Sequence, residues 1–148
     1  MPKKKKGKPR RVAPDSLEGV ACLLCDAVSR DPNTGKHSLY GVFDLMWAER
    51  FPLRYGVFTL YAQLKGKGKH RVSIHLVDPT GESKKLGEIE PSVPTTGGFT
   101  LQAELAGVEF KRAGQYRLEV RSGRKTLLHR ILYVKQRPRE QQKTKKKK

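Results

Sequence analysis

An all-β sandwich of about eight strands is the fold that the 148-residue sequence predicts. Three observations favour it. Between the two ends of the chain, apolar residues recur with a period of two, which is typical of strands that bury one face. Short stretches rich in Gly, Pro, Asp and Asn separate these segments. No stretch has the pattern of a long amphipathic helix, so we do not expect a parallel sheet with helical crossovers.

Two segments show the alternation most clearly. In residues 57–64, VFTLYAQL, every second side chain from Phe58 onward is apolar, and residues 71–79, RVSIHLVDP, repeat the pattern from Val72. The other predicted strands are residues 20–28 (VACLLCDAV), 38–48 (SLYGVFDLMWA), 85–89 (KLGEI), 99–105 (FTLQAEL), 115–120 (QYRLEV) and 126–134 (TLLHRILYV).

The predicted turns contain residues that tolerate tight bends or positive φ. They are residues 31–35 (DPNTG), 65–69 (KGKGK), 78–81 (DPTG), 95–98 (TTGG) and 121–125 (RSGRK). Turns that separate many short strands in this way indicate a sandwich or a small barrel.

The segment VEFKRAGQYRLEV, residues 108–120, distinguishes between these two folds. Gly114 and Tyr116 precede Leu118 and Val120, which alternate toward one face. The arrangement resembles the tyrosine corner of immunoglobulin-like domains, in which a Tyr at the start of a strand bonds its hydroxyl to upstream backbone. Leu118 stands where true immunoglobulin domains have their second Cys. We therefore expect an immunoglobulin-like Greek-key β-sandwich, with an ordinary hairpin at this segment as the alternative.

A series of motifs also resembles a known family. The motifs are LLCD (23–26), a Gly-Lys turn (35–36), GVFD (41–44), FP (51–52), HLVDPTG (75–81) and AGQYRLEV (113–120). Their order is similar to that in a bacterial family of small β-sandwich domains of unknown function. The resemblance covers about residues 20–134, and it implies the fold and a bacterial origin. It implies no activity, and the lysine-rich ends lie outside it.

The net charge of +18 is concentrated at the two ends of the chain. Residues 1–11 hold seven Lys or Arg and no acid, while residues 135–148 hold eight against one Glu. Each end therefore carries +7, which leaves +4 for residues 12–134. Because blocks of like charge repel and have no apolar surface to bury, we expect residues 1–11 and 135–148 to be disordered tails. Residues 12–134 are then a single sandwich domain.

Lysine-rich tails suit the binding of polyanions, because neutralising phosphates releases condensed counterions whatever the base sequence. The residues expected to make these contacts are Lys3, Lys4, Lys5, Lys6, Lys8, Arg10, Arg11, Lys143, Lys145, Lys146, Lys147 and Lys148. A possible secondary anion loop comprises Lys65, Lys67 and Lys69 in a Gly-rich stretch, with a solvated loop as the alternative. The sequence thus predicts non-specific binding of nucleic acid or another polyanion. An acidic membrane surface and simple solubility are the alternatives.

No pattern of catalytic or metal-binding residues accompanies these charges. Cys22 and Cys25 lack the further ligands that structural zinc needs, so we interpret them as buried apolar residues. Residues 31–38, DPNTGKHS, lack the first Gly and the Ser or Thr of a phosphate loop, which favours a hairpin turn. His75 and His129 fall within predicted strands, where we expect packed or solvated side chains. We therefore expect no enzyme, no cofactor, no metal and no small-molecule substrate.

The chain has no apolar run near the roughly 20 residues of a membrane span, and its first residues lack the apolar stretch of a signal peptide. We therefore expect a cytoplasmic protein. The alternative function is that of a protein-interaction or scaffolding domain, in which the edge or loops of the sandwich bind another protein and the tails serve solubility.

Overall fold

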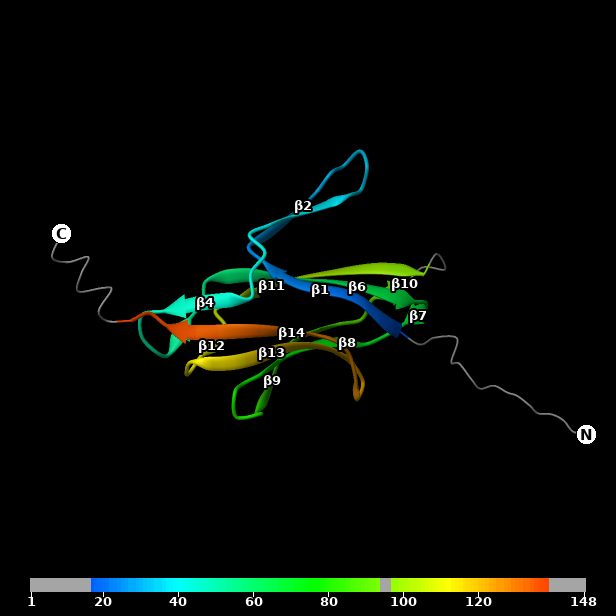
Figure 1. Cartoon of the computed structure of the whole chain (residues 1–148). Helices are drawn as coiled ribbons and strands as arrows, with labels where there is room; N and C mark the ends of the chain where they lie inside the picture. The colour runs from blue at the N-terminus through cyan, green and yellow to red at the C-terminus, as the bar shows by residue number, and fades with distance from the viewer. Residues whose placement is uncertain (1–16, 94–96, 139–148) are drawn as a thin grey trace, which may run out of the picture.

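The computed structural model describes residues 17–93 and 97–138. These residues form fourteen strand segments and no helix, so none of them builds a helix that could cross a membrane. The longer strands lie in two layers (Figure 1). The prediction of an all-β fold is therefore confirmed.

One layer is a three-stranded antiparallel sheet, and the other has five strands. The first, in spatial order, contains β1 (Leu17–Cys25), β6 (Val57–Gly66) and β11 (Gly98–Ala106). The second contains β4 (Leu45–Ala48), β14 (Lys125–Gln136), β13 (Gly114–Ser122), β8 (Val72–Val77) and β9 (Ser83–Ile89). All neighbours are antiparallel except β4 and β14, which run parallel.

Short strands complete the fold in pairs. They are β2 (Ala27–Arg30) with β3 (His37–Tyr40), β5 (Leu53–Arg54) with β12 (Glu109–Phe110), and β7 (Gly68–Lys69) with β10 (Ser92–Val93). The β2–β3 hairpin stands out from the sandwich (Figure 1). Its turn is the predicted DPNTG segment, in which the Asp31 carboxylate accepts a hydrogen bond of 2.8 Å from the Asn33 amide.

The strand order matches an immunoglobulin-like Greek-key sandwich. Strands β1, β6 and β11 take the places of immunoglobulin strands A, B and E, and β8, β13 and β14 take those of C, F and G. The predicted fold class is therefore confirmed. The tyrosine corner then belongs to β13, the F strand, as it does in that fold.

The number of strands differs from the predicted eight. Each of the eight predicted segments does form strand, but two of them are divided. The first is interrupted at Asp26, whose amide donates to the carbonyl of Tyr40 at 2.8 Å, and the second at Gly41, where φ is +67°. Four two-residue strands account for the rest. Such short pairings arise from contacts between segments that are distant in the sequence, so no local alternation of apolar and polar residues predicts them.

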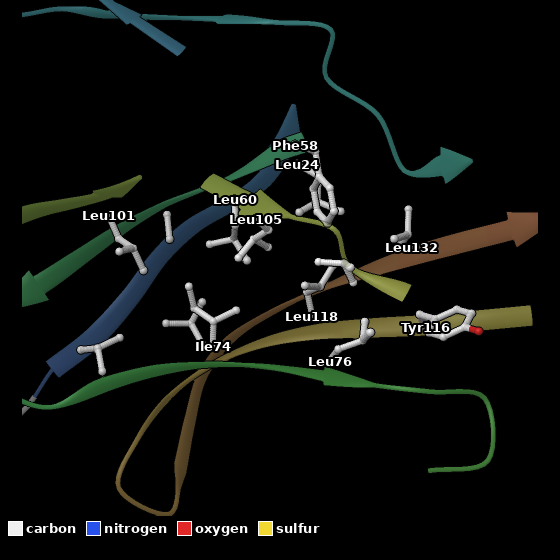
Figure 2. Packing of buried hydrophobic residues seen from close by; sticks show 14 of the residues in the cluster. Leu24, Phe58, Leu60, Ile74, Leu76, Leu101, Leu105, Tyr116, Leu118 and Leu132 are labelled. Carbon is white, nitrogen blue, oxygen red and sulfur yellow. The ribbon is translucent and has the colours of Figure 1, made fainter. Parts of the chain in front are cut away.

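The core lies between the two sheets. Side chains from the two layers point toward one another, with Phe58 and Leu60 on one side and Leu76 and Leu118 on the other (Figure 2). Phe58, Leu60 and Leu118 are fully buried. Burying a side chain of this size stabilises the fold by about 1.5–3 kcal/mol, so this apolar layer is what holds the two sheets together.

The tyrosine corner forms as predicted. The Tyr116 hydroxyl donates to the Arg112 carbonyl at 2.6 Å, and its ring packs edge-on against Phe110 with centroids 5.1 Å apart. Burial raises the pKa of Tyr116, which keeps the hydroxyl protonated as a donor. At Gly114 φ is +146°, and a Cβ there would lie 2.6 Å from Pro79 Cγ. The corner thus fixes the crossover from the three-stranded to the five-stranded sheet.

Two segments differ from their predicted roles. Residues 65–69, predicted to be a turn, lie mostly in strands, because they carry the chain from β6 through β7 toward the other sheet. Strand β14 continues through Lys135 and Gln136, which the sequence assigns to the C-terminal tail. Pairing of these two residues with Trp47 and Ala48 explains why the strand extends so far.

Strand β1 begins and β14 ends at opposite ends of the sandwich (Figure 1).

Candidate functional site

Among the described residues, the outer face of the five-stranded sheet carries the main cluster of charged and titratable side chains. Tyr116, Leu118 and Val120 of β13 point into the core, so the alternate residues Arg117 and Glu119 point outward. Strand β13 lies in the middle of the sheet, between β14 and β8. Its outward side chains therefore meet those of both neighbours.

Glu119 is the centre of an ion-pair network on this face. Its side chain is buried, although it lies outside the core. Arg117 Nε donates to one carboxylate oxygen at 2.6 Å and Arg121 Nε donates to the other at 2.8 Å, with Arg121 Nη2 in an ion pair with that oxygen at 2.7 Å. Burial alone would raise the pKa of Glu119, but the hydrogen bonds from the two arginines hold it below its usual value. Glu119 is thus an ionised carboxylate that fixes two guanidinium groups.

Two histidines flank this carboxylate. In the ladder, Glu119 pairs with His75 of β8 on one side and with His129 of β14 on the other. His75 Nε2 lies 2.9 Å from the Ser73 hydroxyl, and burial together with Arg121 lowers the pKa of His75. Within residues 17–93 and 97–138, no three His, Cys, Asp or Glu side chains are placed to hold a metal ion. We therefore describe the row of His75, Glu119 and His129 as a polar surface and not as a metal site.

Glu119→Gln is expected to lower the free energy of unfolding by about 1–2 kcal/mol at neutral pH, because charge-assisted hydrogen bonds to partly solvated arginines are lost. The folded-state pKa of Glu119 is depressed. Its stabilising effect is therefore present above the unfolded pKa of about 4.3 and is lost as the pH falls through the folded pKa. Urea unfolding curves recorded at neutral and at acidic pH measure this effect. The difference in the free energy of unfolding between the variant and the wild type should be smaller at acidic pH.

Glu104→Gln is a suitable control, because Glu104 is an exposed carboxylate on β11. It should change stability little at either pH. An effect of Glu119→Gln that is the same at neutral and acidic pH would contradict the assigned role of the ionised carboxylate. Asp78 and Glu88 also have lowered pKa values, so the variant should keep part of the acid sensitivity of the wild type.

Two exposed aromatic side chains lie on the same face, nearer its β4 edge. Trp47 of β4 is 48% exposed and Tyr133 of β14 is 42% exposed. The parallel register pairs Lys135 with Trp47 and Tyr133 with Leu45, so all four side chains point to the same side. Sequence reasoning missed this pair, because it interpreted Trp47 as one of several aromatics spread through the strands as core or sheet-face residues, which form no platform for nucleic acid. Only the β4–β14 pairing brings the two aromatics together.

The site residues predicted from the sequence fall mostly outside the described part of the chain. This applies to Lys3, Lys4, Lys5, Lys6, Lys8, Arg10, Arg11, Lys143, Lys145, Lys146, Lys147 and Lys148. The secondary candidate, Lys65, Lys67 and Lys69, has exposed side chains. The amide of Gly66, however, donates to the Gly97 carbonyl and that of His70 to the Pro91 carbonyl, so neither is free for a phosphate. Anion binding by the three ammonium groups stays a prediction.

The two cysteines behave as the sequence suggests. Cys25 is fully buried, and Cys22 is partly buried against the core. Burial raises the pKa of Cys22 to about 11. Both thiols are thus packing residues, since neither has the thiolate character that reactivity requires.

A groove opens where the edges of the two sheets face each other. Strands β9 and β11 lie at the ends of their respective strand orders. Between them is a cavity of about 520 Å³. Its lining includes the core residues Val72 and Ile74, the partly buried Phe99 and the exposed Ile89. The groove is therefore mostly apolar and continuous with the core, and its lining also includes Glu88 and Glu104.

Comparison with known proteins places the chain in a family. The model of a family of unknown function, DUF6941, matches residues 20–135. This range agrees closely with the resemblance found in the sequence motifs. No curated protein matches the chain.

Solved structures resemble the chain in fold. A β-glucosidase from Listeria innocua in complex with glucose has a TM-score of 0.50 and 11% identity over 81% of this chain, which spans 16% of the glucosidase. An alkylpurine DNA glycosylase from Pseudomonas fluorescens, bound to DNA with an abasic site analogue, gives 0.49 and 10% over 82% of this chain and 31% of its own. An immunoglobulin-like protein from Pseudomonas aeruginosa gives 0.42 and 16%, over 83% of this chain and 99% of its own. At sequence identities this low, the similarity is one of fold alone.

Proposed function

Because the chain belongs to DUF6941, a family of unknown function, we propose its function from its own charges and fold. We propose a non-enzymatic cytoplasmic sandwich domain whose basic ends bind nucleic acid without sequence preference. The observation that carries the proposal is the distribution of charge, with +7 in residues 1–11, +7 in residues 135–148 and +4 between them. Charge that is concentrated in this way favours a polyanionic partner.

The geometry of the sandwich supports this proposal. The N-terminal segment joins it at Leu17 and the C-terminal segment at Gln136, which lie at opposite ends of the molecule (Figure 1). Strand β14 has twelve residues, and a strand of that length spans roughly 40 Å. Basic segments that join the sandwich at two points separated in this way can neutralise phosphates on both sides of the domain. Counterion release then supplies the binding free energy at each contact.

The test compares the full-length wild type with a variant in which the terminal Lys and Arg residues named above are replaced by Gln. Fluorescence anisotropy of labelled duplex DNA and single-stranded RNA is recorded across a salt series. For the wild type, affinity should fall as salt rises, with log K changing by about −0.9 per phosphate contact on duplex DNA per unit of log salt. The Gln variant should bind more than tenfold more weakly at low salt and show a much smaller salt dependence.

Lys84→Gln/Lys111→Gln provides a matched control, because both lysines are exposed in the sandwich itself. This control should bind as the wild type does. Failure of the wild type to bind either nucleic acid at low salt would overturn the proposal. Equal binding by the wild type and the Gln variant would show that the ends are not responsible.

The groove between β9 and β11 favours a second candidate function, the binding of an extended protein segment. Edge strands accept an added strand through backbone hydrogen bonds, and pockets for alternate side chains give specificity. Here the free edge of β11 would pair with the segment, and its apolar side chains would enter the groove beside Phe99 and Ile89. In this case the binding free energy comes from buried apolar area, so the interaction should persist at high salt.

Ile89→Lys tests this candidate, because it places a charge at the rim of the groove. A protein partner that binds the wild type and the Gln variant at high salt, but not Ile89→Lys, would support it. Binding that is unaffected by Ile89→Lys would exclude the groove. Either result leaves the nucleic-acid measurement above intact.

A further inference from the structure

We propose that Trp47 and Tyr133 form a stacking platform for the bases of single-stranded nucleic acid on the outer face of the five-stranded sheet. This inference rests on the proposed function, and it adds a site and a ligand class to it. The basic ends alone would treat duplex and single strands alike as lines of phosphates. Exposed aromatic rings would distinguish the two, because only unpaired bases can leave their neighbours and stack on a protein side chain.

The register of β4 and β14 positions the two rings. Trp47 lies beside Lys135, and Tyr133 lies beside Leu45, one alternation back along both strands. The two residues are therefore diagonal neighbours on the same face of adjacent strands, and adjacent strands lie about 4.8 Å apart. About half of each side chain is exposed to solvent, which is unusual for Trp. Leu45, the ladder partner of Tyr133, and Ile131, two residues before it on β14, are partly buried apolar residues on the same face.

Two basic residues border the platform. Arg117 pairs with Ile131 in the ladder, which puts it diagonal to Tyr133 on the β13 side, and Lys135 adjoins Trp47. The Arg117 side chain is 45% exposed, and its Nε is fixed by Glu119. The buried carboxylate therefore holds a guanidinium at the border of the aromatic patch. Bases on the rings would bring their phosphates toward Arg117 and Lys135.

The chain itself connects the platform to the C-terminal charges. Lys135 is the ladder partner of Trp47, and the remaining seven Lys and Arg of residues 135–148 all follow within thirteen residues. A strand of nucleic acid attracted by those charges is thereby delivered next to the two rings. This complementarity of charge is the reason to assign a nucleic acid, rather than a protein, to the aromatic patch.

The measurement uses the fluorescence of Trp47, which is the only tryptophan in the sequence. Full-length protein is titrated with oligo(dT), with oligo(U) and with heparin, a polyanion that has no bases. Both oligonucleotides should quench Trp47 by stacking, and heparin should bind without comparable quenching. Trp47→Ala/Tyr133→Ala should lose oligo(dT) affinity by about tenfold for each ring removed, whereas its affinity for heparin should not change.

Two further variants make the test specific. Tyr40→Ala removes a ring that is 55% exposed on the β2–β3 hairpin, and it should bind oligo(dT) like the wild type. Trp47→Phe/Tyr133→Phe keeps two stacking surfaces and should retain most of the affinity. If this Phe variant were as weak as the Ala variant, stacking would not be the cause.

The outcomes separate this inference from the proposed function. Binding of oligo(dT) by the Ala variant with wild-type affinity would overturn the platform and leave the basic ends as the binding site. A wild type that binds neither oligonucleotide nor heparin would overturn both. A loss of self-association in the Ala variant, measured by size-exclusion chromatography without any change in oligo(dT) binding, would instead assign the patch to protein contacts and overturn the platform.

Discussion

Phe110→Ala is expected to lower the free energy of unfolding by about 3–5 kcal/mol. Phe110 is fully buried, packs edge-on against Tyr116 and belongs to the main core cluster. Removing the ring forfeits its transfer free energy and leaves a cavity under the tyrosine corner. The backbone there is held by the hydrogen bond from Tyr116 to the Arg112 carbonyl, so it cannot readily collapse into the space. Urea unfolding at equilibrium measures the change.

Tyr40→Ala is the control for Phe110→Ala. It deletes an aromatic side chain that is 55% exposed, so its effect should stay near 0.5 kcal/mol. A loss below about 1 kcal/mol in Phe110→Ala would contradict the central place of the corner in the core. Because the corner holds the crossover to β13, the loss should also appear as a large fall in the midpoint of thermal unfolding.

Gly19→Ala is expected to destabilise the fold by about 1–3 kcal/mol or more. A Cβ at Gly19 would lie 2.3 Å from Leu128 Cγ and 2.5 Å from the backbone oxygen of Leu127. The side chain of Leu128 has some freedom, but the Leu127 oxygen belongs to β14 and moves only with that strand. The register of β1 shifts between Gly19 and Ala21, which lets its backbone approach β14 at this point.

Gly87→Ala is the matched control, since Gly87 also lies in a strand but has no atom within 4 Å of the position that a Cβ would take. It should be neutral or slightly stabilising, because Ala has less conformational freedom to lose on folding than Gly. Both variants are compared by urea and thermal unfolding. Equal effects of the two substitutions would show that β1 does not approach β14 as closely as described.

The two stability predictions bear on the proposed binding surface. Strand β14 carries Tyr133 and Lys135, and it contacts β1 near Gly19 as well as pairing with β4. A change that displaces β14 should therefore weaken the stacking of bases as well as the fold. Gly19→Ala is accordingly unsuitable as a binding control, whereas Gly87→Ala should leave the affinity for oligo(dT) unchanged.

Features that depend on residues close together in the chain could be predicted from the sequence. The alternation of apolar and polar residues located β6, β8, β11 and β13, because a strand that buries one face has an apolar residue at every second position. The turns at Asp31 and Asp78 were predictable, since a carboxylate that accepts from amides two residues ahead needs no distant partner. The tyrosine corner spans only five residues, from Arg112 to Tyr116. The concentration of charge at the ends is likewise a property of the sequence alone.

Which strands lie side by side could not be predicted from the sequence, because it depends on how the whole chain packs. The parallel pairing of β4 with β14 joins Trp47 to Lys135 and Tyr133, and the order β14-β13-β8 sets His129, Glu119 and His75 in one row. The groove between β9 and β11 exists because these strands end their respective sheets. The alternation of apolar and polar residues shows which face of a strand is buried, but it does not show which strand lies beside it. Register between distant strands is set by the packing of the whole core, and the surfaces proposed to bind ligands arise from that register.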